Sequence, residues 1–299
     1  MNEGSVRTKQ RDLPCESAFP WHGTIEEQIV YLLRYAILAP SSHNSQPWRF
    51  SVVQNTVELR PDPPPWLRGA GSDNREHDIS LGCALENVLI AAERFGFGHE
   101  VVYPADGRTG APAASVTLLA EGMPSTCRPV ELFEAFTSLT TNRGRYQRRP
   151  VPVDAVAQLR ECAVDGGVGL FLTDDPEIRR QVRELVVCAD RQLVSNAAWR
   201  RDAAALASAP FVGLLHSTRD DRESRIRVGQ SFERLRLAAA YRHLSIRPLG
   251  QIVELPEMRR ALQLLLPDHD AYPQHPFSVG YARAASSPAS RRQTEAVLA

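Results

Sequence analysis

Two similar segments half a chain apart constrain this sequence more than any other feature. "GCALENVLIAA" begins at Gly82, and "GQSFERLRLAA" begins at Gly229, 147 residues later in a chain of 299. Both carry Glu four residues after the Gly, a branched aliphatic residue eight after it, and then Ala-Ala. Such a match can arise by chance in Ala-rich helices, but the strand patterns flanking both copies favour an internal duplication. The small residues would let two equivalent helices pack closely about a pseudo-twofold axis.

Helix and strand patterns alternate along the chain without a regular βαβ rhythm, which predicts an α+β fold. Thr24 and Glu27 form a capping box that opens a helix over residues 25–39. Further strong helices are predicted at 79–96 and about 224–243, and strands at 48–53 and 56–61 form a hairpin. We expect a flexible N-terminal arm (1–20), a first half (21–129) and a second half with a C-terminal tail (130–299).

The composition disfavours several classes of protein. The 35 basic and 35 acidic side chains cancel, which argues against nucleic acid or an anionic membrane as a partner. No run of about 18 apolar residues predicts a transmembrane helix, and the polar start does not resemble a signal peptide. A cytoplasmic location is therefore expected. Five scattered cysteines without a C-x-x-C pair, and eight histidines without a ligand motif, predict neither a disulfide framework nor a metal site.

A dense polar cluster, "PSSHNSQPW", occupies residues 40–48 between the first predicted helix and the first predicted strand. It places Ser41, Ser42, Asn44 and Gln46 within six positions, with Pro40 ending the helix. Side chains of this kind can end a helix in a turn. They can equally hold a polar ligand, because hydroxyl and amide groups both donate and accept hydrogen bonds. Turn chemistry does not require Gln-Pro-Trp, and this favours the ligand.

"APSSHNSQPWRF" resembles the flavin-binding signature of the nitroreductase family, and "TNRGRY" resembles its counterpart in the single-chain Acg-like branch. "LGQIVELPEMRRAL", "FSVGYA" and "SPASRR" resemble that branch in order and spacing. The resemblance covers roughly residues 24–298. It implies a nitroreductase-like fold with a central mixed sheet and packed helices, and FMN bound where two subunits meet. A duplicated chain would mimic the family dimer, so a monomer suffices for one site and a homodimer is not excluded.

The resemblance also implies which residues bind the cofactor. The first half holds the Pro-Ser-Ser segment, and the second half holds "TNRGRY", so each supplies what the other lacks. One composite FMN site per chain is expected, with its pseudo-symmetric twin lost. Arg143 matches the basic flavin contact of the family. The implied cofactor-binding residues are Pro40, Ser41, Ser42, Asn44, Gln46, Asn142, Arg143, Arg145, Gly250 and Arg291.

The sequence departs from the branch at two places. Ser138, Leu139 and Thr140 stand where arginines usually precede the Thr-Asn-Arg, and Ala289 replaces a common basic residue. A phosphate needs at least one fixed cation, for which the fork of arginine is well shaped. Arg145, Arg291 or Arg292 would have to supply it.

The implied function is an FMN-dependent oxidoreductase that passes hydride from NADH or NADPH to an electron-poor acceptor, a nitroaromatic or a quinone. The flavin carries the chemistry, so no catalytic side chain is required. The alternative is a flavin-binding or flavin-sequestering protein without turnover. A third possibility, favoured by the departures, is a remnant of the fold that binds no flavin.

Overall fold

The computed structural model describes residues 13–62, 74–104, 111–139, 144–163, 166–193, 206–283 and 289–299. Its α-helices are α1 (Ile25–Ala36), α2 (Arg75–Arg94), α3 (Val130–Glu134), α4 (Val153–Ala163), α5 (Pro176–Leu193), α7 (Arg222–Tyr241), α8 (Gln251–Glu254) and α9 (Pro256–Gln263). Its strands are β1 (Trp48–Val53), β2 (Thr56–Pro61), β3 (Gly98–Val102), β4 (Ala114–Leu119), β5 (Val168–Thr173), β6 (Phe211–Ser217), β7 (Ser245–Pro248) and β8 (Tyr272–Gly280). No helix in these ranges is long and apolar enough to cross a membrane.

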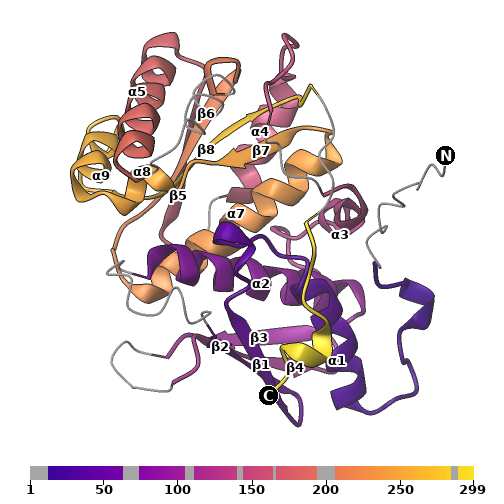
Figure 1. The fold of residues 1–299 in the computed structure, drawn as a ribbon. Helices are drawn as coiled ribbons and strands as arrows, with labels where there is room; N and C mark the ends of the chain where they lie inside the picture. The colour runs from indigo at the N-terminus through magenta and orange to yellow at the C-terminus, as the bar shows by residue number, and fades with distance from the viewer. Residues whose placement is uncertain are drawn as a thin grey trace, which may run out of the picture.

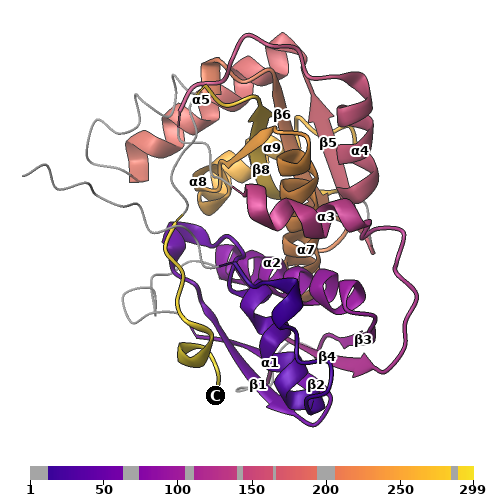
Figure 2. The ribbon, with the colours of Figure 1, turned by 90° about the vertical axis from the view of Figure 1, so that its right-hand side faces the viewer.

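The strands form two four-stranded sheets with the same topology. One has the order β1-β2-β4-β3 and the other β5-β6-β8-β7, and every strand pair in both is antiparallel. In each half two strands precede a long helix of 20 residues, α2 or α7, and two more strands follow. The second half adds α5 between β5 and β6, and α8 and α9 between β7 and β8. Figures 1 and 2 show the two sheets at opposite ends of the molecule, with α2 and α7 side by side between them.

The two long helices meet at the glycines of the repeated segment. A methyl group on Gly82 would overlap the Ile226 carbonyl and lie 2.9 Å from the Gly229 Cα. A methyl group on Gly229 would overlap the Ile79 carbonyl and lie 2.8 Å from the Gly82 Cα. Each of these carbonyls belongs to the residue three positions before the opposite glycine, so the contact is symmetric. The internal duplication predicted from the sequence agrees with this pseudo-twofold axis and with the matched sheets.

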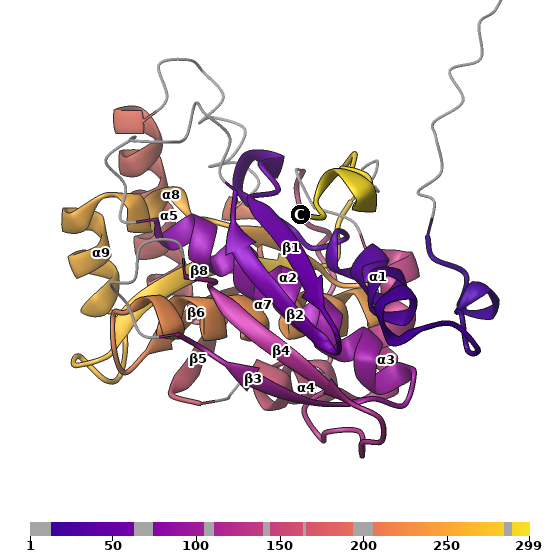
Figure 3. The ribbon, with the colours of Figure 1, turned by 90° about the horizontal axis from the view of Figure 1, so that it is seen from below.

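The α+β class is confirmed, but the sheet arrangement differs from the single central mixed sheet that was expected. Strands pair within their own half, because α2 and α7 occupy the space between the sheets (Figure 2). Seen from below, the first sheet lies in front of these helices (Figure 3). The one parallel pairing among the described residues joins Phe50 of β1 to Leu298. There the Phe50 N–H donates to the Val297 carbonyl and the Ala299 N–H to the Phe50 carbonyl, both at 2.8 Å. The C-terminal tail therefore attaches to the first sheet.

Most predicted elements agree with the structure, but α2 begins earlier than expected. The capping box at Thr24 and the hairpin at Gln54 are present as predicted. The first turn of α2, residues 75–78, is rich in charged side chains and precedes the helix predicted from residue 79. Arg75 is only 2 % exposed because it pairs with Asp220 at 2.9 Å and with Gln274, both from the second half. The boundary predicted between residues 129 and 130 stays a prediction.

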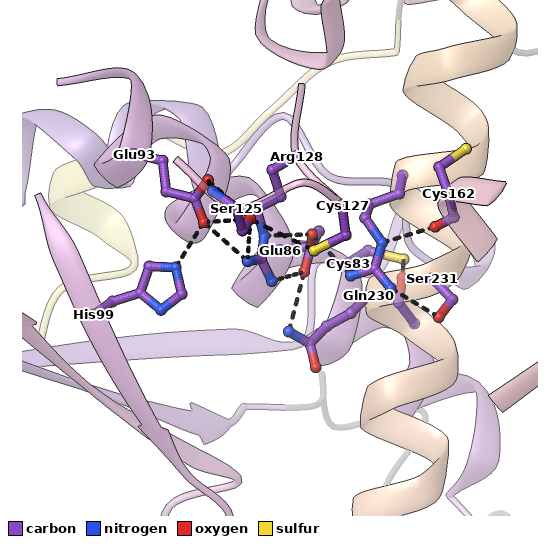
Figure 4. A network of polar contacts seen from close by, with 12 residues as sticks. Cys83, Glu86, Glu93, His99, Ser125, Cys127, Arg128, Cys162, Gln230 and Ser231 are labelled. Carbon is purple, nitrogen blue, oxygen red and sulfur yellow. Dashed lines mark hydrogen bonds and ion pairs between the residues drawn. The ribbon is translucent and has the colours of Figure 1, made fainter. Parts of the chain in front are cut away.

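A buried ionic network joins α2 to α7 (Figure 4). Glu86 is fully buried and accepts from Arg128 Nε at 2.7 Å and from Arg234 Nη1 at 3.0 Å. Burial opposes the charge of Glu86, but these two guanidinium groups hold its pKa below the usual value. The Gln230 amide also donates to Glu86 at 3.0 Å. Such a network fixes the register of the two helices, since a buried charge without its partners is strongly destabilising.

Candidate functional site

A cavity of about 440 Å³ lies between the two halves. The first half contributes the segment after α1 and one face of α2, and the second contributes α7, α8 and residues of β7 and β8. The lining residues are Pro40, Ser41, Ser42, His43, Glu76, Ile79, Ser80, Cys83, Phe232, Pro248, Gly250, Gln251, Glu254 and His275. Its volume falls within the range of cavities that hold a small organic molecule.

Four residues singled out in the sequence line this cavity. Pro40, Ser41 and Ser42 reach it from the first half and Gly250 from the second, although more than 200 positions separate them. Gly250 begins α8, and a methyl group there would overlap the Glu76 carboxylate. The structure thus brings the two halves of the predicted site together at this point, and the glycine permits close packing of α8 against α2.

The segment from Ser41 to Gln46 has an unusual backbone. His43, Asn44 and Gln46 have positive φ values of 52°, 56° and 48°. Asn tolerates this conformation, but it costs other residues about 1–2 kcal/mol each. The Gln46 N–H donates to the Ser41 hydroxyl at 2.9 Å, which closes the loop. Strain of this kind persists only where surrounding contacts impose it, and it is concentrated at functional sites.

The C-terminal tail supplies those contacts. Arg291 donates to the Asn44 side-chain carbonyl at 3.0 Å, and the Asn44 amide donates to the Ser290 carbonyl at 3.2 Å. The Arg292 N–H donates to the Gln46 side-chain carbonyl at 2.8 Å. Asn44, Gln46 and Arg291 therefore do not line the cavity; Asn44 is bonded to Arg291, and Gln46 to Arg292. The tail thus brings Arg291 and Arg292 to the junction at residues 40–48, whereas the arginines missing from the family pattern would stand at positions 138–140.

The remaining predicted residues are placed differently. Arg145 has an exposed side chain and does not line the cavity, although its backbone carbonyl accepts from the Arg283 N–H at 3.0 Å. Asn142 and Arg143 lie outside the described residues. His43 is exposed and also lines the cavity. Trp48 is fully buried and packs in the core.

Sequence reasoning missed the lining contributed by α2 and by the second-half sheet. Glu76, Ser80 and Cys83 share one face of α2 at helical spacing, and that spacing is a signal that was available. Phe232 of α7 and His275 of β8 gave no such signal. Only the packing of β8 against α7 brings these two rings together, with centroids 4.2 Å apart and edge to face.

Two buried groups at the site have pKa values shifted by burial. Burial lowers the pKa of His275 to about 4, so its imidazole is neutral at pH 7. Burial raises the pKa of the Cys83 thiol well above its usual value, and this thiol donates to the Gly229 carbonyl at 3.2 Å. Cys83 is therefore not a thiolate nucleophile.

The position related to the cavity by the pseudo-twofold axis is occupied by side chains. Arg227 stands 147 residues after Ser80, and its guanidinium lies 4.4 Å from the centre of the Tyr103 ring. Gln230, the counterpart of Cys83, accepts from the Tyr103 hydroxyl at 2.7 Å. Large polar residues thus replace the small residues that line the cavity, and the two halves are no longer equivalent at this point.

Comparisons with known proteins agree with the resemblance seen in the sequence. A model described as "Nitroreductase family" matches residues 25–70, which include the polar junction. Two curated proteins of Mycobacterium tuberculosis, from strains H37Rv and CDC 1551, are each 26% identical over 306 residues. The match covers 89% of this chain and 88% of each relative; the H37Rv protein is named "Putative NAD(P)H nitroreductase Rv3131".

Solved structures of nitroreductases align with about half of the chain. A nitroreductase with bound FMN from Desulfitobacterium hafniense aligns with a TM-score of 0.48 at 9% identity, over 55% of this chain and 95% of its own. A nitroreductase with bound FMN from Bacteroides fragilis aligns with a TM-score of 0.42 at 16% identity, over 55% of this chain and 92% of its own. The family model and the curated relatives confirm the chain's resemblance to the nitroreductase family.

Proposed function

Given this resemblance to the nitroreductase family, we propose that the chain is an FMN-dependent oxidoreductase. It would transfer hydride from NADH or NADPH to an electron-poor acceptor, either a nitroaromatic or a quinone. The observation that carries the proposal is the composite cavity, because Pro40, Ser41 and Ser42 meet Gly250 there across the two halves. The relatives named as NAD(P)H nitroreductases and the neighbours with bound FMN support the same cofactor and reductant.

The residues present fit FMN. Phe232 and Ile79 provide apolar wall for a flat ring, and the Ser41 and Ser42 side chains provide hydroxyls for its polar edge or its ribityl chain. Both ring nitrogens of His275 are buried without a hydrogen-bond partner among the described residues, as expected for a cavity that takes a polar ligand.

The tail supplies the candidate cations for the phosphate, although both are already engaged: Arg291 bonds Asn44, and Arg292 pairs with Asp62 at 3.6 Å. Arg291 and Arg292 lie against the junction through Asn44 and Gln46, and an arginine fork binds phosphate oxygens in pairs. Asn142 and Arg143 complete the proposed set on the grounds of the sequence alone. Arg143 would stabilise negative charge on the ring.

When bound, FMN would accept a hydride from the reduced nicotinamide and then pass the two electrons on to the acceptor. The protein's own part is binding and exclusion of water. Ile79 and Phe232 keep one side of the cavity dry, which strengthens the hydrogen bonds made inside it. Gly250 and the small side chains of Ser80 and Cys83 leave room for the ring. At the twin position Arg227 and Tyr103 fill that room, which supports one FMN per chain.

A flavin-binding protein without turnover is the second candidate. It is favoured by the closure of the junction, where the tail engages both the Asn44 and the Gln46 side chains. A tail that stays bound would restrict the approach of a second substrate. The two candidates differ in whether reduced nicotinamide reaches the bound flavin.

The visible absorption spectrum of the purified protein, followed by anaerobic addition of NADPH and then NADH, tests the proposal. Protein that holds FMN and bleaches with either nucleotide, then recovers with a quinone or nitroaromatic, is the expected result. Protein that holds FMN and stays oxidised supports the non-catalytic candidate. Failure of apo-protein to bind added FMN would refute both and leave the flavin-free remnant.

A further inference from the structure

His275 contrasts with Gln274, the buried polar residue beside it on β8, because its ring has no hydrogen-bond partner among the described residues. Its side chain is 6 % exposed, and neither Nδ1 nor Nε2 has a hydrogen-bond partner among the described residues. Its neighbour Gln274 is fully buried, yet donates to the Ser217 hydroxyl at 2.8 Å and bonds to Arg75. A buried polar group without a partner is destabilising and rare.

The place of His275 indicates which kind of partner it would bond. It lines the cavity together with Ser41, Ser42 and Gly250. Phe232 packs against it edge to face at 4.2 Å, which holds the ring in position. A neutral imidazole carries one N–H donor and one acceptor nitrogen. It therefore matches the edge of an uncharged ring that alternates carbonyl and N–H groups, and it cannot neutralise an anion.

We propose that His275 is a ligand-contacting residue of the cavity and hydrogen-bonds the carbonyl or N–H edge of a planar, uncharged ring system. The inference rests on the proposed function, because that function places such rings in this cavity. Two sources share the chemistry: the pyrimidine edge of the FMN ring, and the ring carbonyl or carboxamide of a quinone or nicotinamide bound beside it.

Three variants separate a ligand contact from a structural role. His275→Leu removes both nitrogens at similar volume, and His275→Gln keeps a donor and an acceptor. His216→Leu is the matched control, since His216 lies half-buried on the neighbouring strand β6 and does not line the cavity. The first measurements are the apo-protein melting temperature and the FMN dissociation constant from quenching of flavin fluorescence.

In His275→Leu we expect the stability of the apo-protein to be kept or raised and its affinity for FMN to fall. His275→Leu should melt at the same or a higher temperature without ligand, because an apolar group replaces an unsatisfied one. Its dissociation constant for FMN should rise about tenfold, the effect of one lost hydrogen bond in a dry site. His275→Gln should recover affinity to within about threefold, and His216→Leu should bind FMN like the wild type.

A second experiment shows whether the ring that bonds His275 belongs to FMN or to the second ligand. If His275→Leu binds FMN normally, the loaded protein is titrated with a quinone and with nicotinamide, and the shift of the flavin absorption band is followed. A tenfold weaker response than wild type assigns His275 to the second ligand and also supports the proposal. The proposal would be overturned if His275→Leu bound FMN, quinone and nicotinamide as tightly as the wild type does. That outcome would leave the proposed function intact. A wild type that binds no FMN would overturn both.

If His275→Leu does not fold, the contact can be tested in the wild-type protein, where the His275 side chain is present. Selective ¹⁵N labelling of the histidine rings in the wild type gives ring signals, and His275 is assigned by the signals absent from His275→Gln. Its ring nitrogens should shift on addition of FMN or of the second ligand. Ring signals that stay in place with both ligands bound would refute the contact.

Discussion

Arg291 donates a 3.0 Å hydrogen bond to the side chain of Asn44, although 247 positions separate the two residues. The same guanidinium donates to the Leu38 carbonyl at 3.2 Å, at the start of the segment that follows α1. The chain's last residues thus hold the strained loop that begins the cavity wall. This contact links the folding of the tail to the shape of the candidate site.

Replacing Asn44 with Ala should weaken FMN retention without unfolding the protein. The change removes the bonds to Arg291 and to the Ser290 carbonyl, so the tail cation loses its anchor. A dissociation constant raised about tenfold is expected, since hydrogen bonds to charged groups contribute about 1.5–3 kcal/mol. Fluorescence titration with FMN measures it.

Asn55→Ala is the matched control, because Asn55 also bonds a backbone carbonyl, that of Leu118 at 2.8 Å, but at the far end of the hairpin. It should lower stability and leave FMN affinity unchanged. FMN affinity that is the same in Asn44→Ala and wild type would contradict the role of Asn44.

Gly82→Ala and Gly229→Ala should each destabilise the protein by about 1–3 kcal/mol, the usual cost of forcing a group into a packed interface. Each added methyl group would overlap a carbonyl of the facing helix. Helix propensity alone predicts the opposite sign, because Ala favours a helix by about 1 kcal/mol over Gly.

The sign of the change in unfolding free energy, measured with urea, therefore decides between packing and propensity. The two costs should be similar, because the contact is symmetric, and they should not add in the double variant. A stabilised Gly82→Ala would show that α2 and α7 do not meet at this point.

Acid should destabilise the protein through Glu93. Burial raises the pKa of this carboxyl, but hydrogen bonds from His99 and Ser125 and the charge of Arg128 outweigh it and lower the pKa to about 2. A folded-state pKa below the unfolded value near 4.5 gives stability that is complete above about pH 4.5 and is lost as the pH falls towards 2.

Glu93→Gln should therefore be less stable at pH 7 and show a flatter decline between pH 4.5 and 2 in urea titrations. Glu177→Gln is the control, since the pKa of Glu177 is also lowered to about 2, by Arg180 and Gln181, but on an exposed helix surface. Solvent screens that pair, so its loss should change little. If the unfolding free energy of Glu93→Gln fell with pH in parallel with that of the wild type, Glu93 would not be the source of the acid sensitivity.

The protein should bind one FMN per chain rather than two. Arg227 and Tyr103 fill the position that mirrors the cavity, with Gln230 bonded to the Tyr103 hydroxyl. Flavin absorbance against protein concentration, after saturation and removal of free FMN, gives the ratio. Arg227→Ser, which introduces the residue found at position 80, should keep the ratio at one, because Tyr103 and Gln230 remain. Two FMN per wild-type chain would refute the composite site.

Several features of the fold were predictable because they depend on local physics. The Thr24 capping box, the hairpin at Gln54 and the strand over residues 48–53 follow from caps, turn chemistry and alternation. The repeat around Gly82 and Gly229 predicted the close helix pair, since only glycine permits backbones to approach this closely.

Long-range pairing decided what the sequence left open. The start of α2 was missed because charged residues such as Arg75 are normally exposed, and only Asp220 and Gln274 from the other half make its burial favourable. The division into two antiparallel sheets depends on α2 and α7 filling the space between them.

At the candidate site, the sequence by itself determined the polar junction, the glycine at position 250 and the tail arginines. It did so through a motif whose residue types suit a polar, anionic cofactor. Only the tertiary structure decided that Asn44 holds Arg291, and that the neutral ring of His275 lines the same cavity. The physical reason is that the burial of a side chain and its hydrogen-bond partners depend on residues far away in the chain. The local sequence does not specify which of these distant residues come into contact.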